Sequence, residues 1–395
     1  MPTLLWALLA GNFAIGTGVM AAGATLNEVS AFFQVPVSVA GYLIIAAGTV
    51  VCLGAPVLAS LVAPFDRRRL LTLSMLWYGL MHLACAFARD FHWLLVLRVL
   101  AVVPAAVFTP QAAACVGHLM PVAERGRAIT FVFVGWSLAS VLGMPLSAWV
   151  GGVFGWQGAY VMVAALSLLS AAWVWQAMPT DVRPPRFALS SWAQALRSSA
   201  LMLCILVTLL AAAGQFVLFA YFAPYFKQTL GVGASQLSAL FMCFGAFGLV
   251  GNVLMSRHID RIGASRGVMI AMAGMALSLL LWPLGSSLWL AALVMVPWAL
   301  GCFAANSAQQ ARLVALAPPL AGGSIALNTS AMYAGQAVGA GAGGWLIDQQ
   351  GMGTLHWAGL ALMLLAMALS VLATRMVTRN GSPVLAGPVV AKRPC

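Results

Sequence analysis

Long apolar runs alternate with short polar connections along almost the whole chain. Each run is long enough for an α-helix to cross the hydrocarbon core of a bilayer, which takes about 18 or more mostly apolar residues. Twelve such runs can be drawn, so the pattern predicts twelve membrane-spanning helices. They cover residues 4–26, 38–62, 70–88, 92–117, 128–152, 157–178, 200–223, 235–256, 266–285, 288–313, 324–347 and 354–375.

Two of the polar connections resemble each other. Residues 54–69 end an apolar run with Asp66-Arg67, and residues 251–266 do so with Asp260-Arg261, which is 194 positions later in a chain of 395. A feature that recurs at half-length predicts an internal duplication. The predicted domains are a six-helix bundle over 1–178, a cytoplasmic linker over 179–199, a second six-helix bundle over 200–376 and a disordered tail over 377–395.

The composition agrees with a lipid environment. Hydrophobic residues make up 63% of the chain and charged residues 7%, against roughly 25% charged in soluble domains. The net charge of +12 comes from arginine and lysine scattered between apolar runs, which is typical of cytoplasmic loops and not of a nucleic-acid surface.

The distribution of these cations predicts the orientation. With both termini in the cytoplasm, inner loops and tails hold sixteen Lys or Arg, Arg312 among them, and outer loops hold Arg89 and Lys227. Arg98 is then the one cation placed inside a span. We therefore expect a multi-pass protein of the inner (plasma) membrane with no nucleic-acid partner.

The sequence lacks the residue patterns that metal binding, redox chemistry, ATP hydrolysis or intramembrane catalysis would need. The seven cysteines show no metal or redox spacing, and no phosphate-binding loop of the ATPase type is present. No His, Asp or Glu cluster lies at mid-span, as an intramembrane enzyme would need. We expect no metal, no cofactor and no enzymatic activity.

With these features in place, the sequence resembles the major facilitator superfamily, and within it the drug:proton antiporter branch with its arabinose-efflux-like permeases. The resemblance covers nearly all of residues 1–380. It is carried by Gly251 with Asp260-Arg261-x-Gly263-x-x-Arg266, by Gly143-Met144-Pro145-Leu146-Ser147, by Arg98, and by Glu124-Arg125-Gly126-Arg127. The first-half copy of the loop departs from the family pattern, because Arg69 stands where a glycine is expected. The resemblance implies an all-α membrane protein with twelve transmembrane helices in two six-helix bundles.

Charged residues at the inner helix ends are candidates for gating. A carboxylate there can bind a neighbouring arginine or helix in one state and release it in another. Ordinary loop charge that only sets topology is the alternative. The predicted gating residues are Asp66, Arg67, Glu124, Arg125, Asp260, Arg261, Gly263 and Arg266.

Small residues in the fifth span predict close helix packing. Gly135, Gly143 and Gly151 recur every eight residues, with Pro145 between them, and such a face lets helices approach closely. It could form a pliable seam between the bundles, or simply a tight contact with a kink.

Polar or aromatic groups at mid-span are candidates for binding the solute, because such groups are costly in lipid and usually face the interior. Hydrogen bonds between helices are the alternative for each. The candidates are Asn12, Thr17, Arg98, Gln111, Trp136, Gln215, Tyr221, Asn306, Gln309, Asn328 and Gln336.

Acidic residues are absent from the middle of every span. All seven lie at helix ends or in loops, although the resemblance implies an acid in the first span near Gly18 and Val19. Glu28 and His82 are the candidates to carry a proton in its place. Without a carboxylate in the cavity, neutral or amphipathic cargo fits better than organic cations.

The predicted function is export of a small neutral or amphipathic solute, such as a drug, sugar or metabolite, by alternating access; the resemblance implies proton antiport. An importer or uniporter of the same fold without proton coupling is the first alternative, and a membrane-embedded enzyme or sensor is the second. The expected partners are the lipid bilayer, the solute and protons, with the protein acting as a monomer.

Overall fold

The computed structural model describes residues 2–62, 64–121, 124–183, 196, 198–317 and 321–379. Most of the predicted linker and nearly all of the predicted tail lie outside these residues. The first half contains α1 (Pro2–Ala24), α2 (Leu26–Phe33), α3 (Val37–Ala40), α4 (Tyr42–Leu61), α5 (Arg67–Ala86), α6 (Phe91–Leu119), α7 (Arg125–Leu138), a π-helical turn (Ala139–Gly143), α8 (Met144–Phe154) and α9 (Trp156–Ala177). The second half contains α11 (Ser199–Phe219), α12 (Phe222–Leu230), α13 (Ala234–Ile262), α14 (Ala264–Leu281), α15 (Leu288–Leu316), α16 (Ala321–Gln350) and α17 (Leu355–Arg379).

Helix boundaries lie close to the predicted ones. Helices α7 and α8 and the π-helical turn between them form one continuous span, so the described residues contain twelve long helical segments. Ten are apolar and long enough to cross a membrane by composition alone; α5, which starts with three arginines, and the glycine-rich α16 are the other two. The ends of the segments differ from the prediction by at most four residues, except for α13, which ends at 262 and not at 256.

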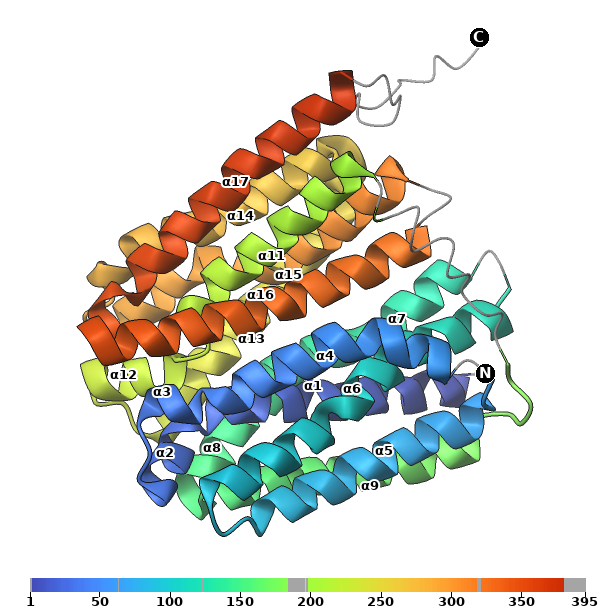
Figure 1. Ribbon diagram of the computed structural model, residues 1–395, viewed down its shortest axis with the longest axis horizontal. Helices are drawn as coiled ribbons and strands as arrows, with labels where there is room; N and C mark the ends of the chain where they lie inside the picture. Colours follow the sequence, from blue (N-terminus) through green and yellow to red (C-terminus); the bar gives the residue numbers. More distant parts are fainter. Residues whose placement is uncertain are drawn as a thin grey trace.

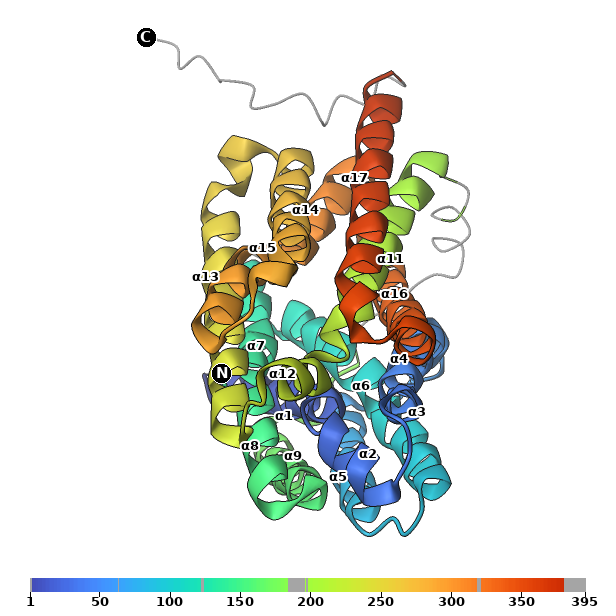
Figure 2. The same cartoon turned by 90° about the vertical axis from the view of Figure 1, so that its left-hand side faces the viewer.

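The two halves lie side by side, with the blue to green helices below and the yellow-green to red helices above (Figure 1). We call the side where α1 begins and α17 ends the terminal side, and the side of α2, α3 and α12 the distal side. Helices of the two halves fan apart toward the terminal side. Seen from the distal side, α12 lies between the halves (Figure 2).

Polar contacts join the halves on the distal side. Ser38 Oγ donates a hydrogen bond of 2.7 Å to Asp348 Oδ1, and Ser238 Oγ donates one of 2.9 Å to the Pro145 carbonyl. The third contact is an ion pair of 3.6 Å between Lys227 and Glu28. These contacts link α3 to α16, α8 to α13 and α2 to α12. We call them the distal seal.

Packing within the halves repeats with a constant offset. A Cβ on Gly135 would collide with the Leu9 carbonyl on α1, and a Cβ on Gly335 would collide with the Leu209 carbonyl on α11. Both pairs are 200 positions apart. Gly143 lies against Thr17, and Gly343, again 200 positions later, lies against Val217. The contact of α1 with the fifth span therefore recurs as the contact of α11 with α16, as a duplication predicts.

Two glycines of α16 form a matched pair for testing this contact. Gly335→Ala is expected to destabilise the protein by about 1–3 kcal/mol, because the added methyl group overpacks a contact with backbone that cannot move aside. Gly341→Ala should change little, because the nearest atom to a Cβ there is Ile45 Cδ1 at 3.7 Å. Thermal unfolding of the two purified variants in detergent measures the difference. Equal melting temperatures would contradict the packing described here.

Arg312 is a correction to the sequence analysis, which placed it among loop cations. It is fully buried in α15, and its guanidinium donates to α17 at Ser370 Oγ (2.9 Å), the Ser370 carbonyl (3.1 Å) and Thr374 Oγ1 (3.0 Å). Three neutral acceptors hold this charge inside the second half, while its Nε has no partner among the described residues.

Candidate functional site

One polar cluster lies in the first half, where α1, α6 and α7 meet. Asn12, fully buried, donates from Nδ2 to the Val132 carbonyl at 3.1 Å. Thr109 Oγ1 donates to Asn12 Oδ1 at 2.7 Å, and Trp136 Nε1 donates to Thr109 Oγ1 at 3.3 Å. Trp136 and Thr109 remain partly exposed. We call Asn12, Thr109 and Trp136 the first-half cluster.

A second polar cluster occupies the matching place in the other half, where α11, α15 and α16 meet. Thr208 Oγ1 donates to Asn328 Oδ1 at 2.6 Å, and Asn328 Nδ2 donates to Asn306 Oδ1 at 3.3 Å. Asn328 is fully buried, whereas Asn306 and Thr208 are partly exposed. We call Thr208, Asn306 and Asn328 the second-half cluster.

The two clusters lie on repeat-related helices. Asn306 lies 197 positions after Thr109, which is the offset between the starts of α6 and α15. The offset of 200 between α1 and α11 puts Ala212 at the place of Asn12, so Thr208 lies about one helical turn away from that place. Both clusters bridge helices across 120 residues of sequence, from Asn12 to Val132 and from Thr208 to Asn328. Sequence reasoning found Asn12, Trp136, Asn306 and Asn328 but missed the two threonines. The offset of 197 residues from Thr109 to Asn306 was a signal that could have found Thr109, whereas the repeat offered none for Thr208.

The structure places the other predicted binding residues elsewhere. Thr17 donates to the Phe13 carbonyl of its own helix at 2.7 Å. Gln309 Nε2 donates to the Cys204 carbonyl at 2.6 Å, and Gln215 Oε1 accepts from Trp298 Nε1 at 3.3 Å. Gln111 and Gln336 are buried on α6 and α16.

Tyr221 belongs to the contact between the halves. Its hydroxyl donates to the Ala340 carbonyl at 2.7 Å, and a Cβ on Gly41 or Gly344 would collide with the same hydroxyl. Tyr221 therefore packs beside the distal seal, away from both polar clusters.

Arg98 and His82 meet inside the first half. Both are fully buried. His82 Nδ1 lies 2.8 Å from the Tyr78 carbonyl, which can only accept, so Nδ1 carries the ring proton. The bare Nε2 then accepts from Arg98 Nη1 at 3.1 Å. This geometry requires a neutral histidine, because a proton on Nε2 would face the guanidinium donor.

Arg98 is a buried cation without a buried anion. Its Nη2 donates to the Val19 carbonyl at 3.1 Å, so a backbone oxygen lies where the resemblance implied an acid. Within the part of the chain that the structure describes, no carboxylate contacts Arg98, and its Nε has no partner. Removing a charge from water is costly unless it is paired, and Arg312 of the second half is likewise buried with neutral acceptors only. Arg98 differs from Arg312 in that one of its acceptors is a titratable ring nitrogen.

Comparisons with known proteins agree with this architecture. The family model described as Major Facilitator Superfamily matches residues 8–319 and 204–389. The chain belongs to the major facilitator superfamily. It is a multi-pass membrane transporter, and the predicted fold class, twelve transmembrane helices in two bundles, is confirmed. The family is a class of transporters and not of enzymes.

Relatives within the superfamily match most of the chain. It is 27% identical over 373 residues to "Inner membrane transport protein YdhP" of Escherichia coli (strain K12), covering 92% of this chain and 95% of that protein. It is 27% identical over 341 residues to a "Probable sugar efflux transporter" of Mannheimia succiniciproducens, covering 86% and 85%. The crystal structure of a D-xylose-proton symporter superposes with a TM-score of 0.75 at 17% identity, covering 93% of this chain and 96% of that one.

The charged residues of the superfamily's loop motif differ between the two halves. Asp66 caps α5 by accepting from the Arg69 amide at 3.1 Å, and it accepts from the Val182 amide at 3.2 Å. Arg67 is buried and donates to the carbonyls of Val62 (3.0 Å) and Phe65 (2.6 Å). These contacts all lie within the first half.

The second-half copy is exposed. Asp260, Arg261 and Arg266 are exposed to solvent. Asp260 and Arg261 lie in the last turn of α13, which the sequence analysis had ended at residue 256, and Gly263 ends the helix with φ +85°. Near the start of α7, Glu124 is exposed and Arg125 Nε donates to the Met120 carbonyl at 3.0 Å.

The fifth span of this superfamily member is irregular where it meets the other half. The π-helical turn at residues 139–143 precedes Pro145, which has no amide hydrogen to donate. A Cβ on Gly245 of α13 would collide with the Ser140 carbonyl, and the backbone at Gly152 approaches Ala234. Gly151 packs within the first half, where its Cβ would lie 3.5 Å from Thr25 Cβ.

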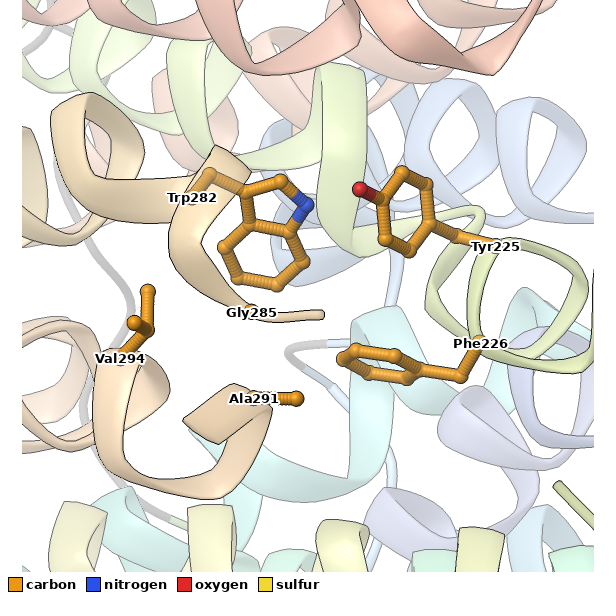
Figure 3. A pocket seen from close by; sticks show the side chains of 6 residues that line it. All are labelled: Tyr225, Phe226, Trp282, Gly285, Ala291 and Val294. Carbon is orange, nitrogen blue, oxygen red and sulfur yellow. The ribbon is translucent and has the colours of Figure 1, made fainter. Parts of the chain in front are cut away.

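An aromatic crevice lies at the distal end of the second half (Figure 3). Tyr225, Phe226 and Trp282 line it together with Gly285, Ala291 and Val294. It has essentially no room for a water molecule, whereas small-molecule pockets measure roughly 300–1,000 Å³. Phe222 stacks on Trp282 with ring centroids 5.3 Å apart, so this region is packed core, and we do not assign it to the solute.

Proposed function

We propose that the protein exports a small, neutral, hydroxylated or amphipathic solute across the inner membrane by alternating access between its two halves. The observation that carries the proposal is the pair of polar clusters on repeat-related helices, which offer amide and hydroxyl groups and no carboxylate. Superfamily members bind substrate near the midplane between their halves. Uncharged donors and acceptors suit a solute with several hydroxyl groups, and Trp136 can stack on an apolar face.

The conformation fits this cycle when the termini are cytoplasmic. The excess of Lys and Arg on the terminal side favours that orientation. The distal seal would then face outward, and the terminal side, where the halves fan apart, would face the cytoplasm. An exporter in this state is ready to take its solute from inside the cell.

We further propose that protons are coupled through His82 and Arg98. The bond from Arg98 to His82 Nε2 and a proton on that nitrogen exclude each other. A conformational change that moves Arg98 away would let His82 take up a proton, and the return of Arg98 would expel it. Glu28 is the weaker candidate, because its carboxylate is held by Lys227 in the seal.

The binding proposal is tested by a ligand screen followed by one substitution. Purified protein is screened by thermal shift against sugars, nucleosides, amino acids and antibiotics, since a ligand of the folded form raises the melting temperature. For the solute found, Asn306→Ala, which removes a partly exposed amide of the second-half cluster, is expected to raise the dissociation constant about tenfold, corresponding to the loss of one hydrogen bond of about 1.4 kcal/mol. Calorimetric titration measures the change.

Asn27→Ala is the matched control, because Asn27 lies in α2 on the distal side, outside both clusters. Unchanged affinity in Asn306→Ala, or an equal loss in Asn27→Ala, would remove the clusters from the binding site. If none of the compounds shifts the melting temperature, the solute class proposed here is wrong.

A further inference from the structure

An open groove lies on the outside of the first half, between α5 and α9 near the terminal side. It has an open volume of about 550 Å³ and is lined by Leu73, Leu76, Leu168, Ala172 and Trp175, with Arg69 at one end. Leu73 is 62% exposed and Trp175 46%. Because both helices span the membrane, the apolar wall of this groove faces lipid chains.

Arginines gather at the terminal end of the groove. Arg68 Nε donates to the Trp175 carbonyl at 2.8 Å, and its guanidinium carbon lies 4.3 Å from the centroid of the Trp175 ring. This contact fixes Arg68 over the tryptophan and leaves its terminal nitrogens free to bind another group. The Arg69 side chain, which lines the groove, has no acidic partner among the described residues.

The arginines lie at the end of α5 where positive charge is least favourable. Arg67, Arg68 and Arg69 occupy the first turn of α5, where the helix dipole is positive and disfavours cations. Arg67 donates hydrogen bonds to loop carbonyls. The two oxygens of the Asp66 carboxylate accept from the backbone amides of Arg69 and Val182, and neither binds a guanidinium group of Arg68 or Arg69. Two guanidinium groups therefore remain at the positive end of a helix, where an anion would relieve the repulsion.

We propose that this groove is a binding site for an anionic phospholipid of the leaflet on the terminal side. The phosphate and charged headgroup lie between Arg68 and Arg69, and an acyl chain lies along the leucines and Trp175. An apolar groove open to the bilayer with two arginines at the membrane interface fits a lipid that has both an acyl chain and an anionic headgroup. A soluble anion would contact the arginines only and leave the apolar wall unoccupied. Tryptophan at a membrane interface is a common anchor of this kind.

Trp175 supplies the readout. The protein is placed in phosphatidylcholine vesicles that contain increasing fractions of phosphatidylglycerol with brominated acyl chains, which quench nearby tryptophan. The Trp175 signal is the difference between the wild-type protein and Trp175→Phe, since the chain has 14 tryptophans. Each arginine near a membrane surface raises affinity for an anionic lipid about fivefold. We expect brominated phosphatidylglycerol to quench half of the Trp175 signal at a lipid fraction at least about fivefold lower than the fraction of brominated phosphatidylcholine that has the same effect.

Arginine variants distinguish a specific lipid-binding site from non-specific electrostatic attraction to an anionic membrane. Arg69→Gln should remove about fivefold of the preference and Arg69→Lys should keep it, while the matched control Arg127→Gln, an exposed arginine of α7, should leave it unchanged. Equal quenching by the two brominated lipids in the wild type would overturn the proposal, because the groove would then hold bulk lipid. An equal loss in Arg69→Gln and Arg127→Gln would overturn it as well, because net charge alone would account for the preference.

Discussion

Replacing His82 with glutamine is expected to abolish uphill transport driven by a proton gradient while solute exchange at equal pH continues. Glutamine can still accept a hydrogen bond from Arg98 through Oε1, so the contact at Nε2 of His82 has a neutral substitute. It cannot take up a proton. For one proton per solute, a gradient of one pH unit supports about tenfold accumulation, and this ratio should fall to about one in the variant.

The measurement uses proteoliposomes with an imposed pH gradient and, in parallel, counterflow without one. His356→Gln is the matched control, because His356 is also buried, lies in α17 of the other half and makes no hydrogen bond through either ring nitrogen among the described residues. Full accumulation in His82→Gln would show that the proton is carried elsewhere, with Glu28 the next group to test. Loss of both accumulation and exchange would assign His82 a structural role only.

A disulfide across the distal seal is expected to stop turnover completely. A Cβ on Gly344 lies 3.5 Å from Ser38 Cβ, within the range of about 3.5–4.5 Å that a disulfide needs. The pair Ser38→Cys and Gly344→Cys joins α3 to α16, and the Tyr221 hydroxyl, 2.7 Å from a Cβ at Gly344, shifts to admit it. Oxidation would hold the halves together on the distal side, so they could not separate there to release the solute.

The experiment requires a background without the seven native cysteines. Transport is measured in vesicles after oxidation and again after reduction, and reduction should restore it. The control pair is Thr25→Cys with Gly151→Cys, which has the same Cβ separation of 3.5 Å but lies within the first half. Transport that continues with the seal fully oxidised would refute a cycle in which the distal side opens.

The helices and their repeat were predictable because hydrophobic length and periodicity determine them. The error at the end of α13 has a local cause. The sequence analysis ended that helix where the apolar run gave way to Arg257 and His258, whereas the backbone continues to Ile262 and stops at Gly263, whose φ of +85° a residue with a side chain rarely adopts. Polarity marks the edge of the membrane, and glycine marks the end of the helix.

Contacts between helices were less predictable, because they depend on how each helix is rotated about its axis. Arg98 and His82 were both singled out, but only the packed helices show that they bind each other. Arg312 was placed in a loop because Ser370 and Thr374, which satisfy it, lie about 60 residues away on α17. Thr109 and Thr208 were overlooked because a threonine in a span can bond to its own helix, as Thr17 does.

The backbone around Val182 determines where the polypeptide could be divided into two separately expressed fragments. The Val182 carbonyl accepts from the Arg67 amide at 3.0 Å, while its own amide donates to Asp66. Val182 is thus bonded to the first half although α9 has already ended at Ala177. A cut directly after α9 would place Val182 in the other fragment and separate it from the Arg67 amide and the Asp66 carboxylate. A split version for coexpression should therefore be divided after Arg183.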